Sequence, residues 1–227
     1  MADNYEVGRF LGKGSFATVH LARNIHTKQS FAIKIIDVTS CQQQQNDIHH
    51  VVEDEPYTIA ALLQREIDVH MSVSSSRHPN IVSLIESFRY NNEITGNEMK
   101  ALILDYCELG DLQSYMKRVR DERKRQQYDE GTRGTLLLPE GTFLSVNQIR
   151  HTVSQVLCGL SFLHARGILH RDIKAPNIFL CPIQTSSVDN TTLNKKGKQN
   201  IQFSLLDCRI KLGDFGLAVQ MEVSILL

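Results

Sequence analysis

The sequence has no excess of charge of either sign. Lysine and arginine together number 25, as do aspartate and glutamate, so the formal net charge at pH 7 is zero. A chain without a global basic field does not attract nucleic acid or an anionic membrane surface over long distances. We therefore expect no nucleic acid and no membrane as partners, and any charged ligand must be bound by a local group of side chains.

Long hydrophobic runs and a cysteine framework are also missing. No stretch approaches the roughly 18 consecutive apolar residues needed to span a bilayer. The N-terminal segment has acidic residues early and contains no apolar signal-peptide core. The five cysteines are scattered, odd in number and without a C-x-x-C spacing, which argues against disulfides and a zinc site. We expect a cytoplasmic or nuclear protein with reduced thiols.

The first half of the chain is predicted to be mostly sheet. With 227 residues, of which 41% are hydrophobic, the chain is long enough for one large domain or two small lobes. Apolar and polar residues alternate between Tyr5 and Asp37, which predicts several antiparallel strands, and two more strands are expected at 81–88 and 100–106. A helix is expected to begin at Pro56. Its apolar residues at helical spacing are Ile59, Leu62, Leu63, Ile67 and Met71.

The second half is predicted to be helical. One helix is expected after Asp111, a suitable N-cap residue, and to continue to residue 125; another covers 145–166. The second has one apolar face, formed by Ile149, Val153, Val156, Leu157, Leu160 and Leu163. We expect a first domain over 1–106 and a second over 107–227. Three stretches have the composition of insertions, namely 38–55, 119–144 and 181–209.

A glycine-containing segment lies between the first two predicted strands. It comprises Gly12, Lys13, Gly14, Ser15, Phe16, Ala17 and, two residues later, Val19. Glycines let a backbone pass close to phosphates with its N–H groups turned inward, and a valine here could pack on a flat heterocycle. A glycine-rich hairpin without a ligand explains the segment equally well. Dinucleotide binding is disfavoured, because the residues after Gly14 look like a strand and not a helix.

A lysine in an apolar strand is the second candidate feature. Lys34 follows Ala32 and Ile33, and a buried ammonium group must be paired with an anion. The candidate partners are a phosphate and the carboxylate of Glu66, which lies on the helix that begins at Pro56. Taken singly, Lys34 is more simply a solvent-exposed strand residue, and Glu66 a surface residue of its helix.

The run from His170 to Asn177, followed by Asp214-Phe215-Gly216, resolves these ambiguities. It matches the catalytic-loop pattern H-R-D-x-x-x-x-N with a later D-F-G. Together with the glycine segment, Ala32-Ile33-Lys34 and the helix glutamate, in this order, it resembles the eukaryotic protein kinase family over residues 5 to about 220. The resemblance implies an α+β, bilobal fold: a small lobe of antiparallel sheet plus one helix, and a large lobe that is helical and incomplete.

The resemblance also implies cofactors and roles. The cofactors are ATP and Mg²⁺, and the substrate is a protein serine or threonine. Asp172 would accept the proton of the substrate hydroxyl, Lys174 would offset the charge of the transferred phosphoryl group, and Asn177 and Asp214 would bind magnesium. Lys34 would bind phosphates and pair with Glu66. The residues implied around adenine are Leu11, Val19, Ala32, the gatekeeper Leu104, the hinge residues Asp105 and Cys107, and Phe179.

Within the family, the sequence is most similar to polo-like kinases of the centriole-duplication type, with the NIMA-related group second, which adds the centrosome to the expected locations. Ala17 replaces the usual third glycine, and no A-P-E pattern follows Gly216. Three alternatives therefore stay open: an active kinase, a truncated fragment or pseudokinase-like ATP-binding module, and a shortened gene model. The apolar 145–166 helix is also expected to promote association through the incomplete large lobe.

Overall fold

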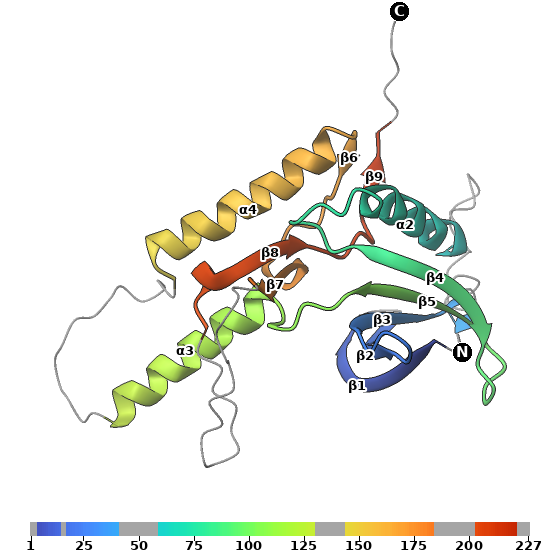
Figure 1. Ribbon diagram of the computed structural model, residues 1–227, viewed down its shortest axis with the longest axis horizontal. Helices are drawn as coiled ribbons and strands as arrows, with labels where there is room; N and C mark the ends of the chain where they lie inside the picture. The colour runs from blue at the N-terminus through green and yellow to red at the C-terminus, as the bar shows by residue number, and fades with distance from the viewer. Residues whose placement is uncertain (1–3, 15–16, 41–58, 130–143, 184–202, 222–227) are drawn as a thin grey trace, which may run out of the picture.

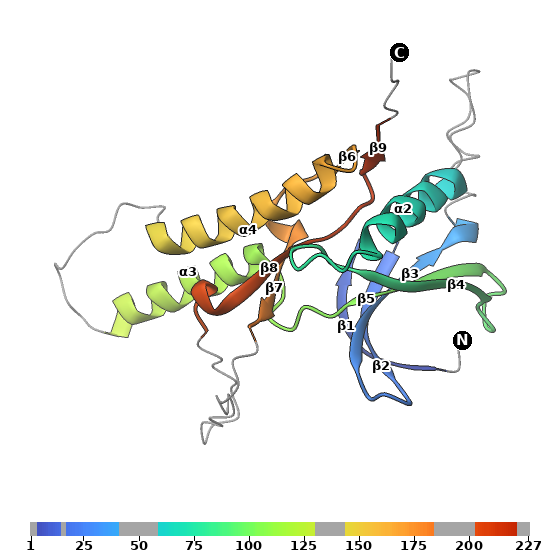
Figure 2. The ribbon, with the colours of Figure 1, turned by 45° about the horizontal axis from the view of Figure 1, so that its top comes forward.

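A computed structural model of the protein describes residues 4–14, 17–40, 59–129, 144–183 and 203–221. The described residues form two lobes (Figure 1). Figure 2 shows two long helices on one side of the molecule and a five-stranded sheet on the other, with a short hairpin between them. The expected α+β, bilobal fold is confirmed.

The small lobe is built on an antiparallel sheet with the strand order β1-β2-β3-β5-β4. One helix, α2 (Ile59–Ser74), packs on this sheet through a cluster that contains Ile67 of the helix and Ile36, Leu84 and Leu102 of the strands. The strands are β1 (Tyr5–Lys13), β2 (Ala17–Asn24), β3 (Ser30–Asp37), β4 (Leu84–Asn91) and β5 (Glu98–Asp105).

The large lobe contains two long helices and, in addition to the prediction, two small sheets. The helices are α3 (Leu112–Asp129) and α4 (Val146–His164). Strand β6 (Ile168–Leu169) pairs with β9 (Val219–Gln220), and β7 (Ile178–Pro182) pairs with β8 (Cys208–Leu212), both antiparallel. Short 3-10 turns precede the hairpin strands, at Ala175–Asn177 and Leu205–Asp207.

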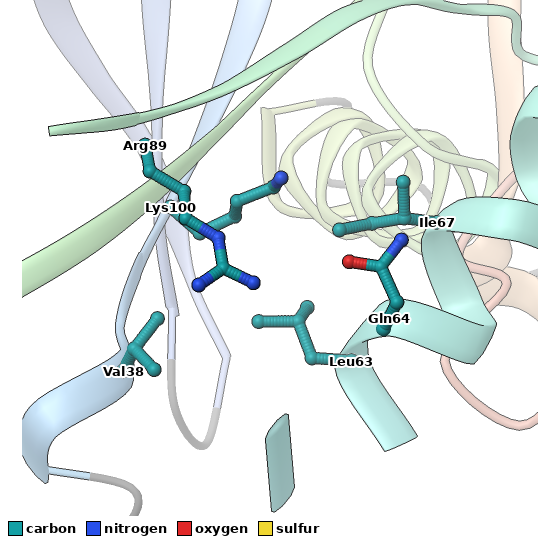
Figure 3. Close-up of a pocket in the computed structure, with 6 residues that line it drawn as sticks. All are labelled: Val38, Leu63, Gln64, Ile67, Arg89 and Lys100. Atoms are coloured by element: carbon teal, nitrogen blue, oxygen red, sulfur yellow. The ribbon is translucent and has the colours of Figure 1, made fainter. Parts of the chain in front are cut away.

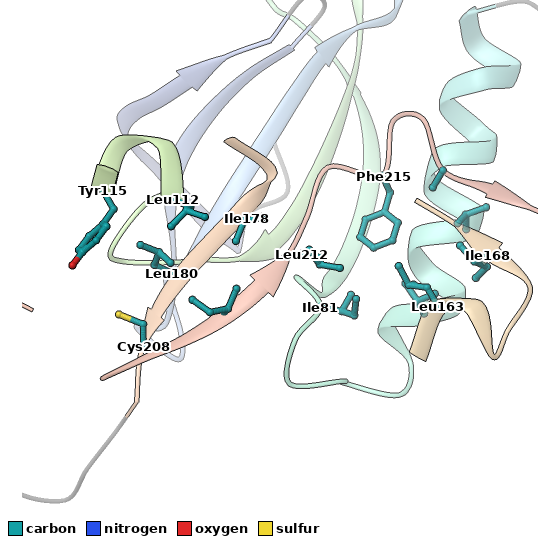
Figure 4. Packing of buried hydrophobic residues seen from close by; sticks show 14 of the residues in the cluster. Ile81, Leu112, Tyr115, Leu163, Ile168, Ile178, Leu180, Cys208, Leu212 and Phe215 are labelled. Atoms are coloured by element: carbon teal, nitrogen blue, oxygen red, sulfur yellow. The ribbon is translucent and has the colours of Figure 1, made fainter. Parts of the chain in front are cut away.

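The largest hydrophobic core joins the two lobes. It is centred on the large lobe, where Ile81, Leu212 and Phe215 lie close together (Figure 4). Val69 and Val73 of α2 belong to the same cluster. Phe215, a residue of the predicted D-F-G motif, is fully buried in the same cluster. Helix α2 is therefore shared by the lobes: Leu63 and Ile67 pack on the sheet (Figure 3), and Val69 and Val73 pack in the core of the large lobe.

Helix α4 buries only part of the apolar face that its sequence predicts. Ser145 caps the helix, accepting from the backbone N–H of Gln148, whose side chain accepts from the Ser145 N–H in return. Leu163 is fully buried, whereas Val153 and Leu157 are 47% and 57% exposed. The reason is that β8 and the core cover only one edge of a broad apolar arc.

Several predicted boundaries are corrected by the structure. The strand expected at 81–88 begins only at Leu84, because Ile81 is buried in the large-lobe core and bridges Leu212 of β8. Part of the 119–144 insertion is helical, since α3 continues to Asp129. Both ends of the 181–209 insertion lie in the β7–β8 hairpin. Of the 38–55 insertion, residues 38–40 are helical and the rest lies outside the described residues. Among the described helices, none is both long and apolar enough to cross a membrane.

Candidate active site

Lys34 is held at the interface of the sheet and α2 by two carboxylates. Its Nζ atom lies 2.6 Å from Oε1 of Glu66 and 3.8 Å from Oδ1 of Asp214. Burial acts against the charge of Lys34, but the two carboxylates outweigh it and hold the pKa above its ordinary value. Lys34 is therefore a permanent cation. The structure thus contains the ion pair that the sequence predicted between the apolar strand and the helix.

A buried histidine ties the predicted catalytic loop to the segment that carries Asp214. His170 is 1% exposed, and its Nε2 atom lies 3.1 Å from the carbonyl oxygen of Gly213. Its Nδ1 atom accepts from the backbone N–H of Asp172 at 3.4 Å. Burial lowers the pKa of His170, so the ring is neutral and these partners assign the proton to Nε2. The histidine fixes the backbone on which Asp172 is placed.

Asp172 is oriented by a lysine and an asparagine. Its Oδ2 atom lies 2.8 Å from Nζ of Lys174 and 2.9 Å from Nδ2 of Asn177. The hydrogen bond from Lys174 is the main cause of a lowered pKa for Asp172, and that from Asn177 acts in the same direction. Asn177 is buried, and its Nδ2 group also donates to the Asp172 carbonyl. The Asp172 carboxylate is thus ionised and held in one orientation.

The Asp214-Phe215-Gly216 segment is anchored by its aromatic residue. The Phe215 ring lies between two histidines, with ring centroids 4.4 Å from His70 of α2 and 5.1 Å from His170. Asp214 adopts a left-handed backbone with φ of 63° and its side chain is 48% exposed. Gly213 donates to the Asn177 carbonyl at 3.0 Å. The anchor buries the phenyl ring and leaves the Asp214 carboxylate at the surface near Lys34.

The structure therefore brings the predicted chemical residues into one connected group. Lys34 contacts Asp214, the backbone of Gly213 joins Asp214 to Asn177, and Asn177 contacts Asp172. These residues come from β3 in the small lobe and from loops around β7 and β8 in the large lobe. Within the group, the Lys34 ammonium lies next to the exposed Asp214 carboxylate. The Asp172 carboxylate and Lys174 form a second pair.

The predicted glycine segment forms the turn between β1 and β2. Gly14 donates to the Ala17 carbonyl at 2.8 Å, and Gly12 pairs with Val19 across the strands. A methyl group added at Gly12 would meet no atom of the described residues within 4 Å. Ala17, the replacement for a glycine, begins β2 in an extended backbone that alanine adopts without strain. Ser15 and Phe16 lie outside the described residues, and Lys13 ends β1.

The residues predicted to surround adenine lie on both lobes. Val19 pairs with Lys34, and Ala32 with Leu104, across neighbouring strands, while Leu11 lies on β1. Phe179 lies on β7, where a Cβ atom added to Gly213 would be 2.9 Å from its ring. Cys107 follows β5 in the connection between the lobes and its carbonyl accepts from Gly110 at 3.1 Å.

Asp105 has a structural contact that the sequence did not predict. Its Oδ2 atom lies 2.6 Å from Nζ of Lys211 on β8 and 3.0 Å from the backbone N–H of Ser83. The carboxylate therefore ties the end of β5 to the hairpin of the large lobe. Sequence reasoning assigned only the backbone of Asp105 to a ligand, and the apolar neighbours of Lys211 gave no signal of a partner.

His70 is the second contact that sequence reasoning missed. Its ring stacks on Phe215, and its Nε2 atom lies 2.7 Å from the Val82 carbonyl oxygen. Burial lowers the pKa of His70 to about 4. A helical position four residues after Glu66, and thus on the same face of α2, is the only sequence signal for this role.

The donor atoms fit a magnesium ion that is shared with phosphates. The described residues contain no cluster of three or more His, Cys, Asp or Glu side chains that could hold a metal ion by themselves. Asn177 uses its amide nitrogen to contact Asp172, which leaves its oxygen for a cation, and Asp214 offers an exposed carboxylate. Magnesium is bound in this way, through one or two protein oxygens together with phosphate oxygens.

Comparisons with known proteins agree with this geometry. The family model "Protein kinase domain" matches residues 5–225. CBL-interacting serine/threonine-protein kinase 13 of Arabidopsis thaliana is 30% identical, over 98% of this chain and 30% of its own. Serine/threonine-protein kinase PLK4 of Xenopus laevis is 26% identical, over 97% and 16%. Serine/threonine-protein kinase atg1 of Neosartorya fischeri is 30% identical, over 79% and 17%. The chain thus spans less than a third of the length of these relatives.

Proposed function

The chain belongs to the protein kinase family, and from this premise we propose that it transfers the terminal phosphoryl group of ATP to serine or threonine hydroxyls of proteins. The relatives named above are serine/threonine kinases, and the polo-like resemblance agrees with PLK4 being among them. The observation that carries the proposal is the connected group formed by Lys34, Asp214, Asn177 and Asp172.

The proposed role of Lys34 is to bind phosphate oxygens. Its ammonium group is paired with Glu66, which fixes its direction, and it lies close enough to Asp214 for both to contact the same ligand. A bound magnesium ion would reduce the repulsion between phosphate oxygens and the Asp214 carboxylate. Asn177 and Asp214 are the residues proposed to hold it. Glu66 acts as a positioning residue, because it orients Lys34.

The proposed role of Asp172 is to orient the substrate hydroxyl. A carboxylate whose pKa is lowered by Lys174 and Asn177 is a weak base, so it cannot remove a hydroxyl proton early in the reaction. It can accept a hydrogen bond from the hydroxyl and take the proton as the oxygen becomes acidic during transfer. Lys174, held against Asp172 at 2.8 Å, places a positive charge beside the position of the transferred group.

A phosphoryl-transfer assay tests the proposal. The wild-type chain is incubated with Mg-ATP labelled in the terminal phosphate and a mixture of serine and threonine peptides, and label on peptide or on the chain is measured. We expect transfer by the wild type and a loss of at least about 100-fold for Asp172→Asn, the range seen for removing a positioned acid–base group. Lys117→Met, an exposed residue of α3, is the matched control.

Two results would contradict the proposal in different ways. Equal labelling by the wild type and Asp172→Asn would mean that Asp172 has no part in transfer. No labelling by the wild type, in a preparation that binds Mg-ATP, would favour the alternative of an ATP-binding module without kinase activity.

A further inference from the structure

Two cysteines that are distant in the sequence are held against each other where the lobes are connected. Cys107 lies in the segment between β5 and α3, and Cys181 lies on β7. The thiol of Cys107 is hydrogen-bonded to the sulfur of Cys181. Both cysteines are free, and both are partly exposed. The fold thus brings two accessible thiols from separate segments into contact.

Contacts on both sides of Cys107 fix this arrangement. Two residues before it, Oδ2 of Asp105 lies 2.6 Å from Nζ of Lys211 on β8. Two residues after it, the backbone N–H of Leu109 donates to the carbonyl of Leu180 on β7 at 3.2 Å. Both partners belong to the β7–β8 hairpin, which also carries the second cysteine. The contact between the thiols therefore follows from two anchors of the backbone around it.

The other described cysteines differ from this pair. Cys208 on β8 is fully buried, and burial raises its pKa to about 12. Because Cys181 pairs with Arg209, the neighbouring Cys208 points to the opposite face of the hairpin. Cys158 is exposed on α4. The chain thus contains one shielded thiol and one exposed thiol with which the pair can be compared.

Of the two paired thiols, Cys181 becomes a thiolate more readily. The hydrogen bond between the thiols lowers the pKa of Cys181 and raises that of Cys107, while burial opposes the thiolate of Cys181. The charge of Lys211 favours this thiolate, whereas those of Asp105 and Glu108 oppose it. The thiolate is the form of cysteine that reacts with peroxides. Cys181 is therefore placed to react first, with Cys107 as the thiol that follows.

We propose that Cys107 and Cys181 form a peroxide-sensitive dithiol, which hydrogen peroxide converts into a disulfide between the connection of the lobes and β7. First, the Cys181 thiolate attacks one peroxide oxygen. An S–O bond forms and the O–O bond breaks, and the leaving hydroxide takes up the proton that Cys181 lost, which gives water and a sulfenic acid.

The second step closes the disulfide. The sulfur of Cys107 attacks the sulfenic sulfur of Cys181, so that an S–S bond forms and the S–O bond breaks. The hydroxide leaves with the Cys107 proton as a second water. The two sulfurs together lose the two electrons that the peroxide gains. Glutathione or dithiothreitol restores both thiols by thiol–disulfide exchange.

The disulfide would join two segments that carry residues proposed to surround adenine. Cys107 is one of these residues, and Phe179 lies two positions before Cys181 on β7. The bond would add a covalent link to the contacts that already hold the connection against the hairpin. The readout is the bond itself, so a failure of this proposal is distinguishable from a failure of the proposed kinase activity.

The test maps disulfides in the full chain after oxidation. The chain is reduced, freed of reductant and treated with hydrogen peroxide; remaining thiols are blocked with N-ethylmaleimide, and linked peptides are identified by mass spectrometry. We expect one predominant link, Cys107–Cys181 within a single chain, which dithiothreitol reverses. It should form at least about tenfold faster than Cys158 is oxidised. The matched control Cys158→Ser should form the same link at the wild-type rate.

Two variants separate the roles of the paired thiols. Dimedone, which labels sulfenic acids, is added together with the peroxide. Cys107→Ser should accumulate label on Cys181, because the thiol that would close the disulfide is missing. Cys181→Ser should acquire label on Cys107 at least about tenfold more slowly, because Cys107 is the weaker acid of the pair.

Several outcomes would overturn the proposal. A peroxide dose that oxidises Cys158 and leaves the pair reduced would refute a sensitive dithiol, and this comparison needs only the wild type. A predominant link to Cys208, or between chains, would assign the second thiol elsewhere. A link that forms equally fast in the urea-unfolded chain would show that the fold does not bring the thiols together. Equal dimedone labelling of the two variants would refute the first attack by Cys181.

Discussion

The buried histidine that stacks on Phe215 should make folding stability depend on pH. Burial lowers the pKa of His70 from the ordinary value of 6.5 to about 4. The unfolded chain therefore binds a proton at this residue between these values, and the folded chain does not. A group whose pKa is lower in the folded chain favours unfolding once the pH falls below its pKa in the unfolded chain. The contribution of His70 to the free energy of unfolding is therefore largest above about pH 7 and decreases below it.

The size of this effect follows from the two pKa values. Between pH 7 and pH 5 a histidine with values of 6.5 unfolded and about 4 folded removes about 2 kcal/mol from the free energy of unfolding. His70→Leu removes the titrating ring and leaves the Val82 carbonyl without its donor, which costs about 1 kcal/mol at pH 7. Between pH 7 and pH 5, the free energy of unfolding of His70→Leu should therefore fall by about 2 kcal/mol less than that of the wild type.

Urea unfolding at pH 7 and pH 5, followed by circular dichroism because the chain has no tryptophan, measures the difference. Comparison with the variant cancels contributions from His170 and the other histidines. His26→Leu, in an exposed turn, is the control and should keep the wild-type pH dependence. If His70→Leu and the wild type lost the same free energy, the neutral buried ring would not be the cause, and the stacking account would be wrong.

Two substitutions probe other contacts of the site. In Gly213→Ala the new methyl group would lie 2.9 Å from the Phe179 ring and 3.0 Å from Val82. We therefore expect the free energy of unfolding in urea to decrease by about 1–3 kcal/mol, and calorimetry to show weaker binding of ATP. Wild-type values for both would refute the steric argument. Lys211→Met removes the cation from Asp105, which keeps the hydrogen bond from the Ser83 N–H, and we expect a loss of about 1–3 kcal/mol in the same unfolding assay. Asp105→Asn in the Lys211→Met background should partly restore this loss; no restoration would mean that the two residues are not coupled.

The secondary structure was predictable where one face of an element is buried. Alternation in the first strands and helical spacing in α2 gave elements of the right type in the right order. The start of β4 was misplaced because Ile81 is apolar for another reason: it packs in the large-lobe core, and the backbone N–H of the next residue, Val82, donates to the Leu212 carbonyl. An apolar run shows burial but does not show which core buries it.

Contacts between distant segments were predictable only where a motif names both residues. The Lys34–Glu66 ion pair follows from the family pattern, and the structure contains it. The stack of His70 on Phe215 could not be predicted, because histidine on a helix has no preferred partner in sequence. The burial of Lys100 on β5 was overlooked for a similar reason: a lysine in a strand is usually exposed, and its burial depends on how α2 crosses the sheet.

The most direct test of the account is the stabilisation of the chain by Mg-ATP. With nucleotide at 100 times its dissociation constant, the wild-type chain should gain about 2.7 kcal/mol in its free energy of unfolding. Lys34→Met and Asp214→Asn, measured at the same nucleotide concentration, should lose most of this gain, because their side chains are proposed to bind the phosphates and the magnesium ion. A wild-type chain that gains nothing, or variants that gain as much as the wild type, would contradict the claim that these residues form one nucleotide site.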